Sequence, residues 1–459
     1  MKKKYKKIYG ILLLTLMVSS SCTKYLDVQR QDSLFEEELF TNATGAQEAL
    51  NGIYRDLSSS DLYGKNLSLY FVDLAAQYYR TQNFEIGQII THSYNTTNLR
   101  DIASKIWTKG FKTILNVNNF CQKMEKDLPA NMSDQQRQNL LAEAYAIRAM
   151  LHFDLLRLFG PIPGNAQSAP TIPYIATVQF EPGVFLSFQD ITTAITTDLI
   201  RARETLAGAS GAPAIVDKDT RWRLNYYAVT TLLARVYLYK GMKDEAWKIV
   251  QESLPAVEQY FPSVKGLTSG DRMFSQEVLF GSENRELYDR YRELFIATLR
   301  DDAIVAPLPR RLQQIYPEAN DLRLQAWFAT GSVGNKNYQT LVKFTDEDVS
   351  QELRYFQPLI RKSELYLIGA ETAPDQTTRY ELINSLRISR NLQPILLDES
   401  LPNAIIAEYA REFIGEGQLF FAYKRLGMGA IPDNGGSSTT IMDATKYNLP
   451  IPQEEIKFR

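Results

Sequence analysis

Apolar residues recur at steps of three and four positions in three long stretches of the chain. The first lies between positions 46 and 57, and the second runs from Ile102 to Met124, before Pro129. The third follows Ser133 and Gln136, which form a capping-box pattern, and stops at Gly160. Such spacing places the apolar side chains on one face of a helix and therefore predicts three amphipathic helices. Their apolar positions are Ala46, Ala49, Leu50, Ile53, Tyr54 and Leu57; Ile106, Trp107, Phe111, Ile114, Leu115 and Val117; and Ala142, Ala146, Ala149, Phe153, Leu156 and Phe159.

The segment 221–255 carries the spacing of a tetratricopeptide helix pair. The matching positions are Leu233, Ala234, Tyr237, Ala246 and Val250, with Gly241 at the predicted turn, Pro255 at the predicted end, and Thr230 where the template has Trp. Small residues at these spacings let paired helices approach closely, and one such pair cannot bury its apolar face alone. Residues 358–390 and 402–427 are also predicted to form helix pairs. The pattern therefore predicts a mainly helical, all-α protein with tetratricopeptide-like helix pairs.

Two long segments, 77–100 and 271–344, have weak helical periodicity and are rich in aromatic, Asn and Arg residues. Loops of this length in a compact protein are usually functional or disordered, and scattered Tyr and Phe argue against disorder. Aromatic faces with nearby hydrogen-bonding groups suit a sugar or a peptide. The alternative for Tyr78 and Tyr79 is packing under the loop, with Arg80 paired to an acid. The candidate ligand-binding residues are Tyr78, Tyr79, Arg80, Asn83, Tyr94, Asn95 and Asn98 in the first segment, and Tyr288 and Tyr291 in the second, with Phe84 and Trp327 nearby.

The first 22 residues have the three-part pattern of a secretion signal. Five lysines precede an apolar run from Ile8 to Val18, and three serines then lead to Cys22. The apolar run is too short to span a membrane. We predict that residues 1–21 are a signal peptide, that Cys22 carries a lipid, that residues 22–38 form a tether and that residues 39–459 form a single body. The alternative is ordinary signal cleavage that leaves Cys22 free.

Composition limits the other function classes. With Cys22 acylated, Cys121 is the only other cysteine, so an intramolecular disulfide is excluded. The net charge of -2 gives no basic field for nucleic acid. The only two histidines, His92 and His152, cannot form an H-E-x-x-H zinc site, and no hydrolase elbow or phosphate-loop motif occurs. We therefore predict no cofactor and no metal.

A glycosidase stays open, because it needs only two carboxylates at the right separation and the chain has 53 acidic residues. Five glutamates fall on predicted helices near arginines, and we interpret them as partners in structural ion pairs. They are Glu143, Glu364, Glu371, Glu412 and Glu416, with Arg148, Arg361, Arg411 and Arg425 as the nearby arginines.

Blocks of characteristic residues follow one another along nearly the whole chain. They begin with Cys22, Tyr25, Leu26 and Asp27, "LFTNATGAQEALNGIYRDL" from position 39, and Trp107 with Phe111, Ile114, Asn118 and Asn119. They continue with "AEAYAIRAMLHFDLLRLFGPIP" from position 142, residues 223–241, and Arg361 with Glu364, Tyr366, Ala370 and Glu371. The last are Asn384, Leu386 and Arg387, then Glu408, Arg411, Glu412, Glu416, Gly417 and Arg425, and "LPIPQEEI" near the end.

Taken in order, these blocks resemble the SusD/RagB family of outer-membrane nutrient-binding lipoproteins. The resemblance implies a helical fold with one loop-rich, ligand-binding side. It also implies a noncatalytic protein that sits as a lid on a TonB-dependent outer-membrane channel and delivers a glycan or a peptide to it. The segment just before the Trp107 helix would meet part of the ligand. The expected location is the outer membrane, facing the cell surface. In such bacteria an acidic stretch just after the lipidated cysteine marks display on the surface, and this chain has only Asp27 there, beside Lys24. The alternatives are a surface-anchored glycan hydrolase and a tetratricopeptide scaffold for envelope assembly.

Overall fold

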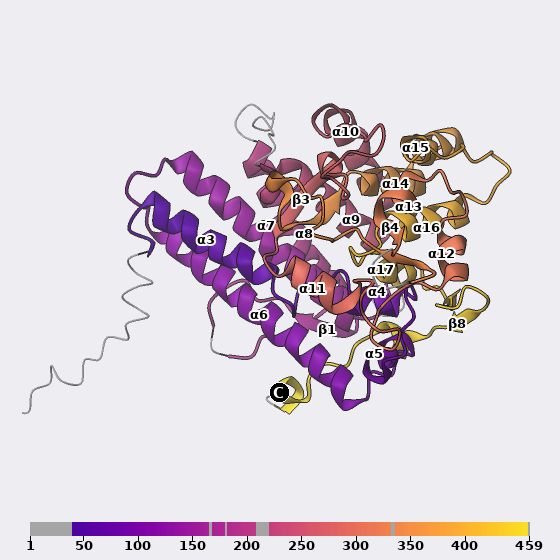
Figure 1. The fold of residues 1–459 in the computed structure, drawn as a ribbon. Helices are drawn as coiled ribbons and strands as arrows, with labels where there is room; N and C mark the ends of the chain where they lie inside the picture. Colours follow the sequence, from indigo (N-terminus) through magenta and orange to yellow (C-terminus); the bar gives the residue numbers. More distant parts are fainter. Residues whose placement is uncertain (1–38, 165–167, 180, 208–219, 332–335, 458–459) are drawn as a thin grey trace, which may run out of the picture.

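Helices dominate the computed structural model, as Figure 1 shows. The structure describes residues 39–164, 168–179, 181–207, 220–331 and 336–457. Within these ranges the strands form four small sheets of two strands each. The prediction of a mainly helical protein is confirmed. The predicted signal peptide, Cys22 and the whole predicted tether lie outside the described residues.

The three long amphipathic helices predicted from the apolar spacing are present. They are α3 (Ala43–Leu57), α6 (Thr97–Lys126) and α7 (Asp134–Phe159), and they lie alongside one another in Figure 1. The capping box at the start of α7 is confirmed, because the side chains of Ser133 and Gln136 each accept a hydrogen bond from the other's backbone N–H. Every residue of α7 from Leu140 to Phe159 is buried, so this helix is the centre of the helical part.

Helices after α7 pack on one another in sequence, as paired helical repeats do. The successive contacts are α7 with α8, α8 with α9, α9 with α10, α10 with α14, and α14 with α15 and α16. Their bounds are α8 (Phe188–Ala207), α9 (Tyr226–Lys240), α10 (Lys243–Tyr260), α14 (Ser363–Thr372), α15 (Gln376–Ser389), α16 (Leu401–Glu412) and α17 (Leu419–Arg425).

The turn and the strand boundaries refine the predicted helix pairs. Gly241 has φ of 79° between α9 and α10, a left-handed conformation that favours glycine. Pro255 does not end α10, which continues to Tyr260, because the buried Val257 and Phe261 hold the last turn against the core. The predicted helix at 358 is wrong: β6 (Phe356–Arg361) pairs antiparallel with β3 (Val278–Glu283) there. Both faces of β6 are buried, and a short apolar run of this kind fits a strand as well as a helix.

The two segments of weak periodicity contain short elements joined by loops. The first holds α5 (Phe84–Ile90), and the second holds α11 (Leu287–Leu294), α12 (Pro309–Ile315), α13 (Leu322–Trp327), β4 (Phe328–Thr330) and β5 (Gln339–Leu341). The remaining elements are α4 (Phe71–Ala75), β1 (Pro170–Pro173), β2 (Phe185–Ser187), η2 (Thr220–Trp222), η3 (Ser275–Glu277), η4 (Gln351–Leu353), β7 (Ala430–Pro432), β8 (Thr439–Ile441), α18 (Ala444–Tyr447) and α19 (Gln453–Lys457).

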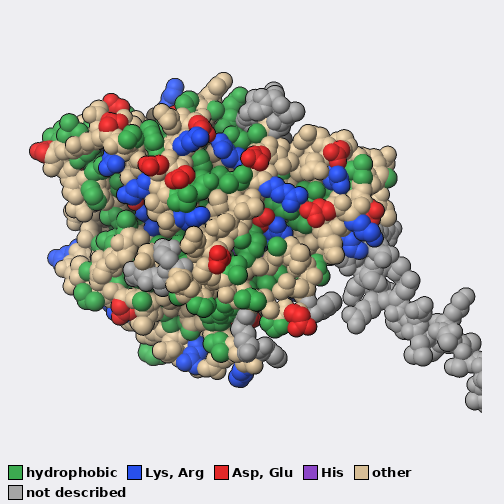
Figure 2. All heavy atoms as spheres, turned by 180° about the vertical axis from the view of Figure 1, so that it is seen from behind, with side chains coloured by type: hydrophobic (Ala, Val, Ile, Leu, Met, Phe, Trp, Pro, Cys, Tyr) green, Lys and Arg blue, Asp and Glu red, His purple; other side chains and the backbone are tan. Residues whose placement is uncertain are grey.

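The surface seen from behind mixes charges of both signs. Figure 2 shows Lys and Arg interspersed with Asp and Glu on this face, as the small net charge of -2 suggests. No helix within the described residues is both long enough and apolar enough to cross a membrane.

A buried network of arginines and glutamates joins the C-terminal helices to the second loop segment. Glu412 on α16 contacts Arg323 of α13 at 2.8 Å and Arg390 at 2.6 Å. Arg390 also pairs with Glu277 of η3, and Arg323 also contacts Glu408 at 2.8 Å. All of these side chains are fully buried. Burial alone would raise the pKa of Glu412. The positive charges of Arg390 and Arg323 outweigh that effect and hold the pKa far below its usual value.

The five glutamates interpreted as structural partners all form ion pairs. Glu412 belongs to the network above, and Glu416 pairs with Arg361 and Lys343. The remaining pairs are Glu143 with Arg223, Glu364 with Arg235 and Glu371 with Arg425. The structural interpretation is therefore confirmed, although four of the arginine partners were not among those expected, namely Arg223, Arg235, Arg323 and Arg390.

Removing one member of the network should destabilise the protein strongly. We expect Glu412→Gln to lower the free energy of unfolding by about 3 to 5 kcal/mol, because it leaves Arg323 and Arg390 buried without their shared carboxylate. The exposed Glu381 on the neighbouring helix α15 offers a matched control, and Glu381→Gln should change stability by less than about 0.5 kcal/mol. Urea denaturation followed by circular dichroism measures both, and equal effects would contradict the role of the network.

His152 should make the protein sensitive to mild acid. Its Nδ1–H donates to the carbonyl of Arg148 at 2.9 Å, and its Nε2 accepts from the N–H of Ile175 at 3.0 Å. Both nitrogens are used by the neutral ring, and burial lowers the pKa of His152 from 6.5 to about 3. The unfolded chain therefore takes up a proton near pH 6.5 that the folded protein resists. Stability should be lost as the pH falls from 6.5 to 4, by roughly 3 kcal/mol from this residue.

The test compares urea denaturation of the natural protein and His152→Gln at pH 4 and pH 6.5. Glutamine keeps one donor and one acceptor but does not titrate. The variant should lose less stability than the natural protein on acidification. It should keep some pH dependence of stability, because burial also lowers the pKa of His92, to about 4. The same pH dependence in both proteins would show that His152 does not carry the effect.

Candidate functional site

Three of the predicted ligand-binding tyrosines lie in the core. Tyr78 and Tyr79 are fully buried, and the hydroxyl of Tyr78 donates to the carbonyl of Ala410 at 2.9 Å. Tyr94 is also buried, and its hydroxyl donates to the carbonyl of Lys446 at 3.0 Å. These rings have no face for a ligand to stack on, so their assignment is wrong. The alternative of packing under the loop is correct for Tyr78 and Tyr79.

Two tyrosines of the second segment are buried as well. Tyr288 and Tyr291 are 7% and 5% exposed on the inner side of α11, and the hydroxyl of Tyr288 accepts from the N–H of Tyr355 at 3.1 Å. Trp327 is fully buried, and its Nε1–H donates to the carbonyl of Arg272 at 2.7 Å. These aromatic residues belong to the core of the second segment, because an apolar ring is stabilised by burial wherever a loop is long enough to cover it.

The predicted asparagines mostly serve the local backbone. Asn83 caps α5 by accepting from the N–H of Ile86 at 3.1 Å. Asn95 is exposed and accepts from Arg100 at 3.4 Å, while Asn98 lies half-buried in the first turn of α6. The three asparagines therefore stay candidate ligand-binding residues, but no pocket described here is lined by them.

Arg80 is the predicted residue that lines a pocket. Its backbone pairs with Ala306, with N–H to carbonyl distances of 2.9 and 3.3 Å, and this bridge joins the first loop segment to the second. A hollow of about 220 Å³ opens at the junction, and we call it the junction pocket. It is lined by Arg80, Thr81, Gln82, Asp301, Ile304, Ala306, Pro307, Leu308, Pro309 and Tyr338.

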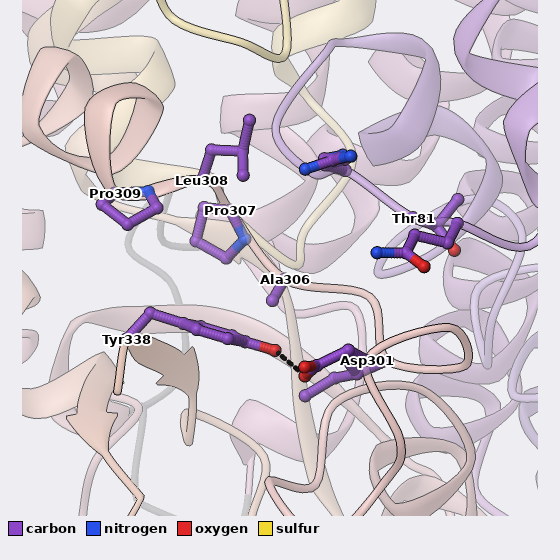
Figure 3. Close-up of a pocket in the computed structure, with 10 residues that line it drawn as sticks. Thr81, Asp301, Ala306, Pro307, Leu308, Pro309 and Tyr338 are labelled. Carbon is purple, nitrogen blue, oxygen red and sulfur yellow. Dashed lines mark hydrogen bonds between the residues drawn. The ribbon is translucent and has the colours of Figure 1, made fainter. Parts of the chain in front are cut away.

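The lining combines an aromatic ring, an apolar wall and hydrogen-bonding groups. Figure 3 shows the ring of Tyr338 below Ala306 and Pro307, with its hydroxyl directed at Asp301. That hydroxyl donates to Oδ1 of Asp301 at 2.7 Å, and Lys336 binds the same carboxylate. The hydrogen bond from Lys336 lowers the pKa of Asp301 the most, and the hydrogen bond from Tyr338 lowers it further. Asp301 is therefore an ionised acceptor, and Arg80, Thr81 and Gln82 supply donors to the lining of the same pocket.

The carboxylates of the junction pocket bear on the glycosidase alternative. Among the described residues that line it, Asp301 is the only carboxylate. Hydrolysis of a glycosidic bond normally uses two carboxylates flanking the bond. Within the described parts of the chain, no three His, Cys, Asp or Glu side chains are grouped so that they could hold a metal ion. The pocket as built can hold a ligand and offers no evident hydrolytic pair.

Two aromatic residues at this site were not selected from the sequence. Tyr338 lies in the second segment, and nothing in the local pattern distinguishes it from Tyr288 or Tyr291. Phe84 was noted among the loop aromatics and is 80% exposed at the start of α5, two residues after the pocket residue Gln82. A single exposed apolar ring is common on protein surfaces, so Phe84 is a candidate only because it lies close in sequence to the pocket residue Gln82.

The positions of the pocket loops depend on polar contacts from the helical part. The Nε–H of Arg311 donates to the carbonyl of Gln77 at 3.0 Å, just before the pocket segment. The hydroxyl of Tyr316 donates to the carbonyl of Arg411 at 2.7 Å, which ties the end of α12 to α16. The loops are thus held on a rigid scaffold, as binding loops commonly are.

Sequence comparison finds relatives along the whole chain. Residues 24–238 match a family model for SusD-like proteins, described as starch-binding and associating with the outer membrane. SusD-like protein P2 of Formosa agariphila is 23% identical, over 99% of this chain and 97% of its own length. SusD-like protein P38 of the same organism is 24% identical over 62% of this chain and 52% of its own length.

Solved structures share the fold. A SusD superfamily protein of Bacteroides thetaiotaomicron has a TM-score of 0.74 at 21% identity, covering 90% of this chain and 97% of that one. This chain is therefore similar to the SusD-like proteins, in sequence over residues 24–238 and in fold over most of its length. A laminarin-binding SusD-like protein has a TM-score of 0.68 at 19% identity, covering 91% of this chain and 98% of that one. Surface glycan-binding protein A of Bacteroides thetaiotaomicron, solved with laminarihexaose, has a TM-score of 0.67 at 18% identity, again covering 91% and 98%. These SusD-like structures carry the same helical architecture as this chain.

Proposed function

We propose that this SusD-like protein binds a nutrient glycan in the junction pocket without cleaving it and delivers it to a TonB-dependent outer-membrane channel. The junction pocket carries the proposal. It offers the ring of Tyr338 and the apolar Pro307 beside the charged or polar groups of Arg80, Gln82 and Asp301. Sugars present apolar faces edged by hydroxyls, which match such a combination of a flat ring with donors and acceptors.

A glycan is favoured over a peptide by the relatives. Two of the structures with this fold bind laminarin or a laminarin oligosaccharide, and the matching family model is described as starch-binding. A peptide stays the second candidate ligand, because Arg80, Gln82 and Asp301 can also bond peptide amides. Phe84 extends the proposed site beyond the pocket, where a chain of several sugar units would continue.

Anchoring by Cys22 is part of the same proposal. A lipid at Cys22 would hold the protein at the outer membrane beside the channel and raise its effective concentration there. We further propose that it faces the cell surface, where nutrients arrive.

The ring of Tyr338 should contribute measurably to binding. We expect Tyr338→Ala to weaken binding of laminarihexaose or maltohexaose by about 1 to 2 kcal/mol, roughly five- to thirtyfold in Kd. Tyr338→Phe should keep most of the affinity, because it keeps the stacking face and loses only the hydrogen bond to Asp301. Isothermal titration calorimetry measures both, with short peptides as the second ligand class.

Tyr260 on α10 provides the matched control, because it is 41% exposed and lies outside the junction pocket. Tyr260→Ala should bind as the natural protein does. We also expect the hexasaccharide to be intact after long incubation with the protein, as measured by chromatography. Cleavage products would favour the hydrolase, and binding that is insensitive to Tyr338→Ala would place the site elsewhere.

Loss of the lipid should release the protein from the membrane. In a host that exports and acylates it, Cys22→Ser should move the protein from the membrane fraction to the soluble fraction and abolish labelling by an alkyne fatty acid. Cys121→Ser serves as the control, because Cys121 is buried and should leave labelling unchanged. Retention of Cys22→Ser in the membrane fraction would overturn the proposed anchor.

A further inference from the structure

A polar cleft lies beside α3, on residues that the junction pocket does not use. It measures about 580 Å³, within the range of roughly 300 to 1,000 Å³ that small-molecule sites have. α3 and η2 both contact β3, so the walls of the cleft belong to one packed unit. We call it the Trp222 cleft. Its walls include Tyr54 and Arg55 of α3, Trp222 of η2, Ser282 of β3, and Arg354, which follows η4.

Trp222 gives the cleft a flat aromatic face. Its ring is half-buried and makes an edge-to-face contact with Phe356, with the ring centroids 4.7 Å apart. Tyr54 is held from behind, because its hydroxyl donates to Glu143 at 2.6 Å and accepts from the N–H of Leu224 at 3.0 Å. Both rings are therefore fixed by the core, and a ligand does not have to order them.

A buried hydroxyl of the cleft lacks a partner. Ser282 is 2% exposed, and its Oγ makes no hydrogen bond to the described parts of the chain. Buried polar groups nearly always have a hydrogen-bond partner, and an exception calls for an explanation. Because Ser282 lines the cleft, a ligand hydroxyl bound there can supply the partner.

Two arginines of the cleft are not committed to acidic partners. Arg55 and Arg354 are exposed, and neither makes an ion pair with a described residue. Arg285, in the same lining, is instead paired with Glu283 at 2.9 Å. The guanidinium groups of Arg55 and Arg354 can therefore donate hydrogen bonds to a ligand.

The charges of the lining favour a neutral ligand. Glu48, Glu283 and Glu352 line the cleft together with its arginines, so a ligand of either charge would meet side chains of its own sign. A hydroxyl donates to a carboxylate and accepts from a guanidinium, so it suits both. Apart from Tyr54 and Trp222, every described residue of the lining is polar or charged, which offers no apolar subsite for the side chains of a peptide.

We propose that the Trp222 cleft is a second binding site, for a neutral oligosaccharide. Trp222 stacks on a sugar ring, and Arg55, Ser282 and Arg354 bond its hydroxyls. The proposal does not rest on the junction pocket, because the two sites share no residue. Two sites on one chain let a long glycan bind at two points, which raises its overall affinity above that of either site.

Tryptophan fluorescence tests the cleft directly. Trp107 and Trp327 are buried, Trp247 lies on α10, and none of the three lines either site. Laminarihexaose or maltohexaose should therefore change the emission of the chain from Thr23 onward through Trp222. Trp222→Phe should abolish this change, while the matched control Trp247→Phe should keep it.

Calorimetry in a Tyr338→Ala background separates the two sites, because the junction pocket is weakened there. The remaining binding of either hexasaccharide should weaken about tenfold with Trp222→Ala and about fivefold with Arg354→Ala. Arg354 is exposed, so its variant tests the cleft even if Trp222→Ala does not fold. Arg201 is also exposed, on α8, and lines neither site, so Arg201→Ala should bind as the Tyr338→Ala protein does.

The outcomes distinguish the two proposals. No binding of either hexasaccharide in the Tyr338→Ala background, or remaining binding that Trp222→Ala and Arg354→Ala leave unchanged, would overturn the second site. Tighter binding of hexagalacturonate or tetra-alanine, with the same fluorescence change, would overturn the neutral sugar as its ligand. Affinity that Tyr338→Ala leaves intact and Trp222→Ala removes would support the Trp222 cleft and contradict the junction pocket.

Discussion

Satisfying buried charge is the constraint on which the C-terminal half of this protein depends. Glu412, Arg323 and Arg390 are all removed from water, and each has its charge offset by the others and by Glu277 and Glu408. A buried charge without a partner costs several kcal/mol, so helices α13 and α16 must meet in one arrangement for all of these groups to pair. The network therefore specifies where the second loop segment sits on the helices.

Hydrogen bonding of a buried carboxylate also positions the first loop segment. Asp73 is buried in α4, and its carboxylate accepts hydrogen bonds from the backbone N–H groups of Gly415 and Gly417. Both glycines have positive φ, and that turn also presents Glu416 to Arg361 and Lys343. Asp73 thus fastens the segment that leads to Arg80 onto the turn after α16. Two loops far apart in sequence form the junction pocket because buried polar groups bring both of them to the same helices.

The junction pocket combines the half-buried ring of Tyr338 with charged and polar side chains, and this combination suits the proposed glycan ligand.

The amino-acid sequence by itself determined the long helices α3, α6 and α7, because apolar residues that repeat at three and four positions over several turns favour a helix with a buried face. It also indicated that glutamates such as Glu364 and Glu371 are structural, since charged residues on buried helices need partners. It could not distinguish Tyr338, which lines the pocket, from Tyr78 and Tyr288, which lie in the core. Only the tertiary structure decided this, because the burial of a loop tyrosine depends on distant segments such as the residues around Ala410 and Tyr355, and local spacing carries no record of them.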